Sequence, residues 1–151
     1  SKGVINWSIE LIIFLWWRLE VVSVKISTLS SFAKKSKWKN KIDGIFENQD
    51  FEALVITDIN QKILWVNNGF TQMTGYSKKF AINKTPNFLQ GENTQKTTKK
   101  RIRTKLELLK PFTEVITNYR KDKTPYKCEV KIIPLYKEKV THFLAIERKV
   151  V

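Results

Sequence analysis

At 151 residues, 42% hydrophobic and 28% charged, the chain is long enough for one domain with a hydrophobic core plus an appendage, and its composition excludes wholesale disorder. One cysteine and one histidine exclude an intramolecular disulfide and a metal site built from cysteine or histidine clusters, and the lack of disulfides favours a reducing, cytoplasmic setting. The net charge of +14 comes mostly from lysine rather than from arginine, the bidentate binder of phosphate and guanine, so we expect a solvated basic surface and no specific nucleic-acid partner.

Residues 5–32 have the pattern of a long helix that buries one side. Apolar side chains recur at intervals of three and four residues, at Ile12, Leu15, Leu19, Val22, Ile26 and Leu29. The stretch 11–17, which includes Trp16, is apolar all round but much shorter than the ~20 residues that cross a bilayer. We expect these side chains to form the interface of a helix that pairs in a homodimer or docks on its own domain. A helix lying on a membrane surface is the alternative.

After a basic linker at 34–41, the remaining elements are short. We expect a helix at 41–49, strands at 53–57 and 62–66, a helix capped by Asn67 or Asn68 and ended by Gly75, a longer helix from about Thr94 to Leu109, and strands at 112–120, 124–136 and 140–149. The last three strands are joined by links short enough for hairpin turns. This order indicates an α+β domain at 51–151 with one sheet covered by helices, preceded by a helical arm and linker at 1–50.

Four phrases carry a family resemblance. They are ILWVNNGFTQMTGYS at 63–77, NFLQG at 87–91, NYRKDKTPY at 118–126 and THFLAIERKV at 141–150. Residues 51–151 resemble a PAS domain, and within that family the LOV branch of flavin-binding blue-light sensors. The resemblance implies a five-stranded antiparallel sheet with helices on one face.

The resemblance also implies a candidate pocket, formed by Thr85, Gln90, Arg103, Asn118, Cys128 and Glu147. The position of the light-reactive cysteine of LOV domains holds Pro86, so we expect no cysteinyl-flavin chemistry. Gln90, Arg103 and Asn118 match flavin-contacting positions, and their amides and guanidinium suit a planar ring and a phosphate. Glu147 is aligned with the glutamine that senses flavin N5. We expect no bound cofactor, with noncovalently held FMN as the alternative.

Strand alternation predicts which side chains share a face. In the orientation that the resemblance implies, Glu147 and Cys128 would face the pocket, whereas Leu144, Ile146, Val115 and Tyr119 would form an apolar outer surface. Such a surface needs a cover, which the N-terminal helix can supply within the chain or from a second protomer. Two plainer interpretations stay open: Glu147 as a partly solvated residue near a strand end, and Cys128 as a small buried apolar residue.

No catalytic motif stands out. The chain has five glycines and no glycine-rich phosphate loop, and one histidine leaves little room for general-base chemistry. We therefore expect a sensory or regulatory module without enzymatic activity, which signals by dimerisation and movement of its flanking helix. An effector domain or protein would lie outside this chain. The alternative is a noncovalent flavin-binding redox or light sensor.

Overall fold

The structure, a computed structural model, describes residues 8–46 and 49–151, with side chains for all of these except residues 14 and 17–26. The elements are α1 (Ile9–Ser36), the 3-10 turn η1 (Ile42–Gly44), β1 (Ala53–Asp58), β2 (Ile63–Val66), α2 (Asn68–Thr74), α3 (Lys78–Ala81), the 3-10 turn η2 (Pro86–Leu89), α4 (Lys96–Glu107), β3 (Phe112–Tyr119), β4 (Pro125–Tyr136) and β5 (Val140–Val150). Two strands, a group of helices and three strands follow one another in the predicted order.

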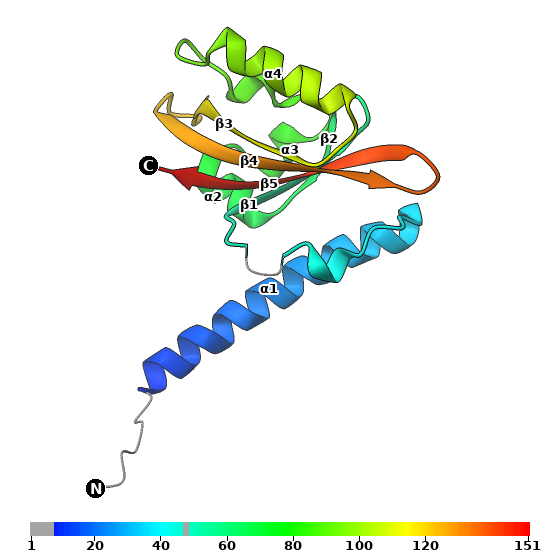
Figure 1. The fold of residues 1–151 in the computed structure, drawn as a ribbon. Coiled ribbons are helices and arrows are strands. Elements are labelled where there is room, and N and C mark those ends of the chain that lie inside the picture. Colours follow the sequence, from blue (N-terminus) through cyan, green and yellow to red (C-terminus); the bar gives the residue numbers. More distant parts are fainter. Residues whose placement is uncertain (1–7, 47–48) are drawn as a thin grey trace, which may run out of the picture.

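The strands form one 5-stranded antiparallel sheet in the order β2-β1-β5-β4-β3, so β5 lies at its centre. Figure 1 shows α4 on one side of this sheet and α1 on the other. Residues of α2 and α3 pack in the same core as Ile102 of α4, so these helices cover the same face as α4. The predicted class is confirmed: an α+β fold with a five-stranded antiparallel sheet, helices on one face and an N-terminal helical extension.

The short helix α2 begins and ends at the predicted residues. The Asn67 side-chain oxygen accepts the Phe70 N–H at 3.0 Å, which caps the helix, and the Leu54 N–H at 2.9 Å, which ties the helix start to β1. Gly75 ends the helix with φ +79°, a left-handed conformation in which glycine has no steric penalty. Asn67 and Gly75 thus fix the two ends of α2.

One expected helix is close to the structure and another differs from it. α4 has its N-cap at Gln95, next to Thr94, and ends at Glu107, two residues before the expected Leu109. The Thr94 hydroxyl donates to the Thr117 carbonyl at 2.6 Å and accepts the Gly91 N–H at 3.0 Å, which holds Thr94 in the loop before the helix. The helix expected at 41–49 is a 3-10 turn over Ile42–Gly44, and no side chain caps its start. Residues 47–48 of that expected helix lie outside the described part of the chain.

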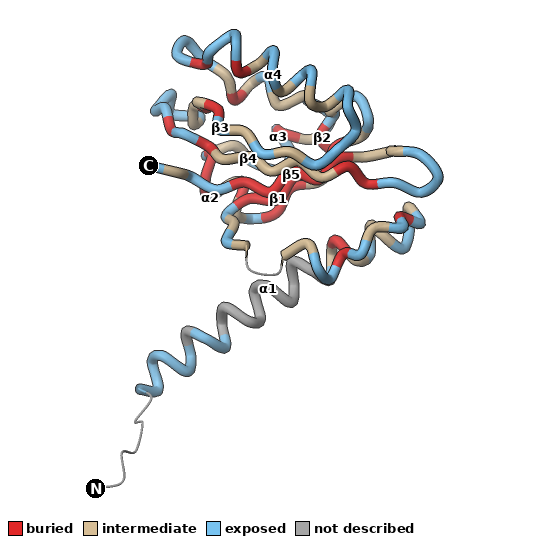
Figure 2. Tube along the Cα trace, viewed as in Figure 1, coloured by how far each residue is buried: buried red, intermediate tan, exposed pale blue. Residues whose placement is uncertain are grey.

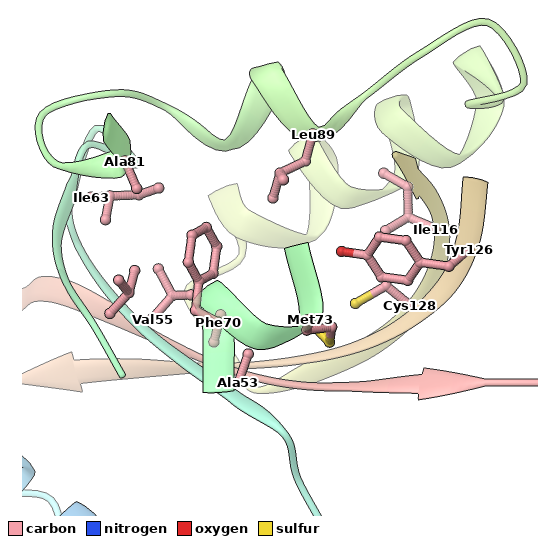
Figure 3. Packing of buried hydrophobic residues seen from close by; sticks show 12 residues of the cluster. Ala53, Val55, Ile63, Phe70, Met73, Ala81, Leu89, Ile116, Tyr126 and Cys128 are labelled. Carbon is pink, nitrogen blue, oxygen red and sulfur yellow. The ribbon is translucent and has the colours of Figure 1, made fainter. Parts of the chain in front are cut away.

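A hydrophobic core lies on each face of the sheet. The inner core packs the sheet against α2, α3 and η2, and its buried members include Ala53, Val55, Ile63, Phe70, Met73, Ala81, Leu89, Ile116, Tyr126 and Cys128 (Figure 3). The outer core packs the sheet against α1 and the segment after it, through Leu29, Trp38, Ile42, Leu54, Ile56, Leu135, Leu144 and Ile146. Figure 2 shows the buried residues concentrated on the central strands, between these two layers.

The helix α1 has two different halves. Its C-terminal half carries Leu29, which is 0% exposed in the outer core, whereas Ile12, Leu15 and Trp16 of its N-terminal half are 44%, 44% and 72% exposed. The side chains of Leu19, Val22 and Ile26 fall in the part that is not described. Among the helices of the described residues, none has the length and apolar character needed to span a bilayer.

Val115 and Tyr119, expected on the outer face, lie away from the outer core. Both are on β3, an edge strand, and the buried strand residues of the outer core come from β1, β4 and β5. Val115 is 44% exposed. The Tyr119 ring lies over Gly91, where an added Cβ would come within 2.5 Å of ring atoms, and its hydroxyl accepts the Asn93 N–H at 2.8 Å. Tyr119 therefore anchors the loop before α4.

Trp38, just after α1, contacts the end of the β4–β5 hairpin. Its indole N–H is shared between the Thr141 hydroxyl at 3.1 Å and His142 Nδ1 at 3.3 Å. The indole and imidazole rings meet edge to face with centroids 5.0 Å apart. His142 is thus half-buried, and burial lowers its pKa while Asp58 opposes the shift.

The two residues after Trp38 extend this attachment. The Lys39 N–H donates to the Tyr136 carbonyl at 2.8 Å. The Asn40 amide donates to the Pro134 carbonyl at 3.1 Å, and its oxygen accepts the Tyr136 N–H at 2.9 Å. We call residues 38–40 the clasp, because they hold the end of α1 to the hairpin by side-chain and backbone hydrogen bonds.

Candidate functional site

A cavity of about 510 Å³ lies between the inner face of the sheet and the helical layer formed by η2 and α4. This volume is within the range of small-molecule sites. Most of its wall is apolar, formed by Val55, Ile63, Phe70, Leu89, Ile102, Leu106, Phe112, Ile116, Val130, Ile132, Phe143 and Ala145. Such a wall suits the flat apolar body of an aromatic ligand.

Polar groups interrupt this wall at a few points. Asn118 of β3 is 6% exposed, and Glu147 of β5 is 7% exposed. Gln90 ends η2 and Thr85 precedes it, and both are half-buried at the cavity. The strands thus bring an amide and a carboxyl to the cavity from the sheet side, and η2 brings an amide and a hydroxyl from the helical side.

Two cations of α4 complete the lining. Arg103 is exposed and Lys99 is half-buried, and their i, i+4 spacing places both on the face of α4 that borders the cavity. No ion pair of either residue occurs in the described part of the chain. Lys99 is not among the site residues predicted from the sequence, although its i, i+4 spacing from Arg103 places the two side chains on the same face of a helix.

The acidic residue Glu114 also lines the cavity, but its charge is already matched. Arg101 Nε lies 3.2 Å and Lys105 Nζ 2.7 Å from its carboxylate. Hydrogen bonds from these two cations hold the pKa of Glu114 below its usual value. Lys99 and Arg103 are consequently left to attract an anionic group at the cavity.

Glu147 is a buried carboxyl rather than a partly solvated one at a strand end. β5 continues to Val150, and Glu147 pairs with Ala53 of β1 on one side and Val130 of β4 on the other. In the described part of the chain its hydrogen-bond donor is the Cys128 thiol, with Sγ 3.8 Å from Oε2. Burial raises the pKa of Glu147 to about 7, and the weak thiol bond lowers it only in part.

Cys128 is the candidate that the structure does not bring to the cavity wall. Its side chain is 0% exposed and lies in the inner core next to Tyr126 and Met73, as Figure 3 shows. Burial, with the neighbouring Glu147 carboxyl, raises the pKa of its thiol, which disfavours a reactive thiolate. Pro86 lines the cavity, and none of the described residues that line it is a cysteine.

The Tyr126 hydroxyl is a polar atom that sequence reasoning missed. It is buried and has no hydrogen-bond partner in the described structure. Burial is the main cause of its raised pKa, with the nearby Cys128 and Glu147 adding to the shift, and the Asn118 side chain beside it acts in the opposite direction. In Figure 3 the hydroxyl points away from its strand into the interior.

The described residues contain no group of three or more acidic, histidine or cysteine side chains placed to hold a metal ion.

Comparison with known proteins supports the fold. A blue-light photoreceptor of Listeria monocytogenes is 36% identical over 102 residues, which are 65% of this chain and 40% of that protein. The solved LOV domain of the blue-light activated histidine kinase of Erythrobacter litoralis is 31% identical with a TM-score of 0.63, covering 68% of this chain and 98% of that one. A LOV domain studied with a flavin analogue has 28% identity and a TM-score of 0.63, covering 66% of this chain and 78% of that one.

The chain spans less than half the length of the Listeria photoreceptor, so the likeness concerns only a part of that protein. The profile of the PAS domain family matches residues 52–148, nearly the whole of the sheet and the helices that cover it. Together with the cavity and the strand order, this match identifies the chain as a member of the PAS domain family, similar to LOV blue-light sensor domains.

Proposed function

We propose that the chain is a signalling sensor in which the state of the cavity is passed through β5 to α1. The observation that carries this proposal is the alternation of β5. Phe143, Ala145 and Glu147 line the cavity. Leu144 and Ile146, between them, lie in the outer core with Leu29 of α1. A change in the cavity that shifts β5 therefore acts directly on the surface where α1 is docked.

In this proposal residues 51–151 are the sensor and residues 1–50 are the signalling arm. Packed cores resist continuous deformation, so a displaced β5 would favour a second docking position of α1 over a gradual adjustment. The clasp fixes the end of α1 to the β4–β5 hairpin, which gives α1 a fixed point about which to move. The chain would perform no catalysis, and its readout would be received by an effector domain or protein outside it.

We further propose that the N-terminal half of α1 pairs with a second copy of the chain. This half presents apolar side chains to solvent, with Ile9 74%, Ile13 61% and Trp16 72% exposed. An exposed apolar stripe on a helix that projects from its domain is typical of a helix that pairs with a partner helix (Figure 2). Movement of the docked half would then change the geometry of the dimer.

The double substitution Ile12→Glu with Trp16→Glu should convert the dimer to a monomer, because it places charges on the pairing surface. Light scattering at micromolar concentration measures the mass of both proteins. The control is Leu108→Glu, at a residue 63% exposed just after α4, which should leave the mass of the dimer unchanged. A wild-type protein that is a strict monomer at this concentration would refute the dimer.

A second candidate, a noncovalently held flavin, is favoured by the chemistry of the cavity. The residues present fit FMN: the amides of Gln90 and Asn118 would pair with the polar edge of its ring, and Arg103 and Lys99 with its phosphate. The apolar wall would cover the ring faces. FMN would supply absorption of blue light and electron-transfer chemistry when bound. Because Pro86 borders the cavity, we propose that no cysteinyl bond to the flavin forms.

The purified protein, or the protein reconstituted with FMN, should absorb at about 450 nm if this candidate is right. Acid denaturation followed by filtration should release the entire colour, since the flavin is not covalently attached. Arg103→Ala should weaken retention of FMN more than that of riboflavin, which lacks the phosphate. A protein that stays colourless after reconstitution would remove the flavin and leave the sensor proposal with another ligand.

A further inference from the structure

We propose that Glu147 determines ligand specificity in the cavity: it binds as a neutral carboxylic acid, whose O–H donates to an acceptor atom on the edge of a planar heteroaromatic ligand. This inference rests on the proposed function, in which the cavity holds a ligand. It adds the identity of the recognising group and the chemistry that the ligand must present. It also predicts that binding depends on pH in a definite direction.

The surroundings of Glu147 favour the neutral form. Its neighbours in the sheet are Ala53 of β1 and Val130 of β4, and both are apolar. An ionised carboxylate needs several donors to offset burial, and in the described part it receives one weak bond from the Cys128 thiol at 3.8 Å. The raised pKa, about 7, agrees with this geometry.

Other titratable groups around the cavity do not stabilise the charge. From β4, Cys128 and Tyr126 face Glu147, and each is itself disfavoured in its anionic form by burial. From α4, Lys99 and Arg103 line the cavity, but neither contributes to the pKa of Glu147, which is set by burial and the thiol. From β3, Glu114 is bound to its own two cations. Glu52, just before β1, acts on Cys128 and raises the pKa of its thiol.

The neutral acid has a donor to offer. The contact given for its carboxyl in the described part of the chain is the one from the Cys128 thiol, in which Glu147 accepts, and Glu147 lines the cavity. The Tyr126 hydroxyl nearby is also buried without a partner, and Asn118 lies beside that hydroxyl. A ligand edge with carbonyl oxygens or ring nitrogens would satisfy the Glu147 donor. An ionised Glu147 would instead repel the same edge, whereas a glutamine would keep a donor at every pH.

The test uses the full chain and has two readouts. The first is ligand-free: the infrared carbonyl stretch of a protonated carboxyl, in the difference between the wild type and Glu147→Gln. We expect the signal to persist to near-neutral pH. The control Glu92→Gln replaces an exposed carboxyl, and the carbonyl signal assigned to Glu147 should be unchanged in that protein. A Glu147 that is fully ionised at pH 6 would overturn the proposal.

The second readout is the affinity for FMN, used as the probe because the edge of its oxidised ring presents acceptors. If the neutral acid alone binds, the wild-type Kd should rise about 30-fold between pH 6 and pH 8.5, a factor that follows from a pKa near 7. The Kd of Glu147→Gln should stay flat apart from the titration of the phosphate, which both proteins share. Equal pH dependence in both proteins would overturn the proposal. If neither protein binds FMN while the infrared signal persists to near-neutral pH, the flavin candidate fails and the neutral Glu147 is supported.

Discussion

The Glu147→Gln protein should be more stable than the wild type at pH 8, by roughly 3 kcal/mol, and about equally stable at pH 4.5. The pKa of Glu147 is raised from 4.5 to about 7 in the folded state, and each pKa unit corresponds to about 1.4 kcal/mol. The folded state therefore binds this proton more tightly than the unfolded state. The stabilising contribution is fully present below pH 4.5 and is lost as pH rises through the folded pKa of about 7. Glutamine does not titrate, so the Glu147→Gln protein does not lose this stability as pH rises.

Urea unfolding at half-unit pH steps between 4.5 and 8 would measure the difference in free energy of unfolding between the two proteins. Taking the difference removes the contributions of Glu114, Asp122 and Glu129, whose lowered pKa values act in both proteins and destabilise the fold only as pH falls. Glu92→Gln, which makes the same chemical change at an exposed site, is the matched control. A constant difference between wild type and Glu147→Gln across this range would mean that Glu147 is solvated in the folded protein.

Leu29→Ala should lower the free energy of unfolding by about 2–4 kcal/mol, the usual cost of removing a fully buried leucine side chain. Leu29 is 0% exposed in the outer core, in the same cluster as Leu144 and Ile146 of β5. The substitution leaves a cavity between α1 and the sheet, which cannot close because α1 is fixed at its end by the clasp. Urea unfolding with a far-UV signal measures the loss.

The matched control for this prediction is Leu108→Ala, which removes the same atoms at a residue 63% exposed. Its free energy of unfolding should stay within about 0.5 kcal/mol of the wild type. If Leu29→Ala behaved like Leu108→Ala, α1 would not be docked on the sheet in solution, and the route from β5 to α1 would be refuted. A measurement at low protein concentration keeps dimer dissociation from contributing to either value.

Much of the fold could be predicted because its signals are local. The alternation of side chains along β5, with a period of two, correctly predicts that Glu147 and Ile146 lie on opposite faces of the sheet. Asn67 and Gly75 mark the ends of α2 through capping chemistry that involves only near neighbours. The five strands follow from short apolar runs separated by turn residues.

The features that escaped prediction depend on contacts between distant parts of the chain. Tyr119 packs over Gly91, and Trp38 reaches His142, and neither pairing has a pattern in the sequence. The sequence alone does not decide whether Glu147 is buried, because its burial depends on how far β5 extends and on which strands pair with it. Arg103 and Lys99 lie together through helix geometry, but their use at a cavity depends on where α4 rests on the sheet.

The alternating faces of β5 also restrict how the sheet can move. Sliding β5 by one residue along its neighbours would turn the Ile146 side chain inward and place the Glu147 carboxyl beneath α1, burying a polar group among leucines and isoleucines. Such a slip is therefore strongly disfavoured, and in the proposed route from the cavity to α1 the displacement of β5 would be a bend or a twist of the strand.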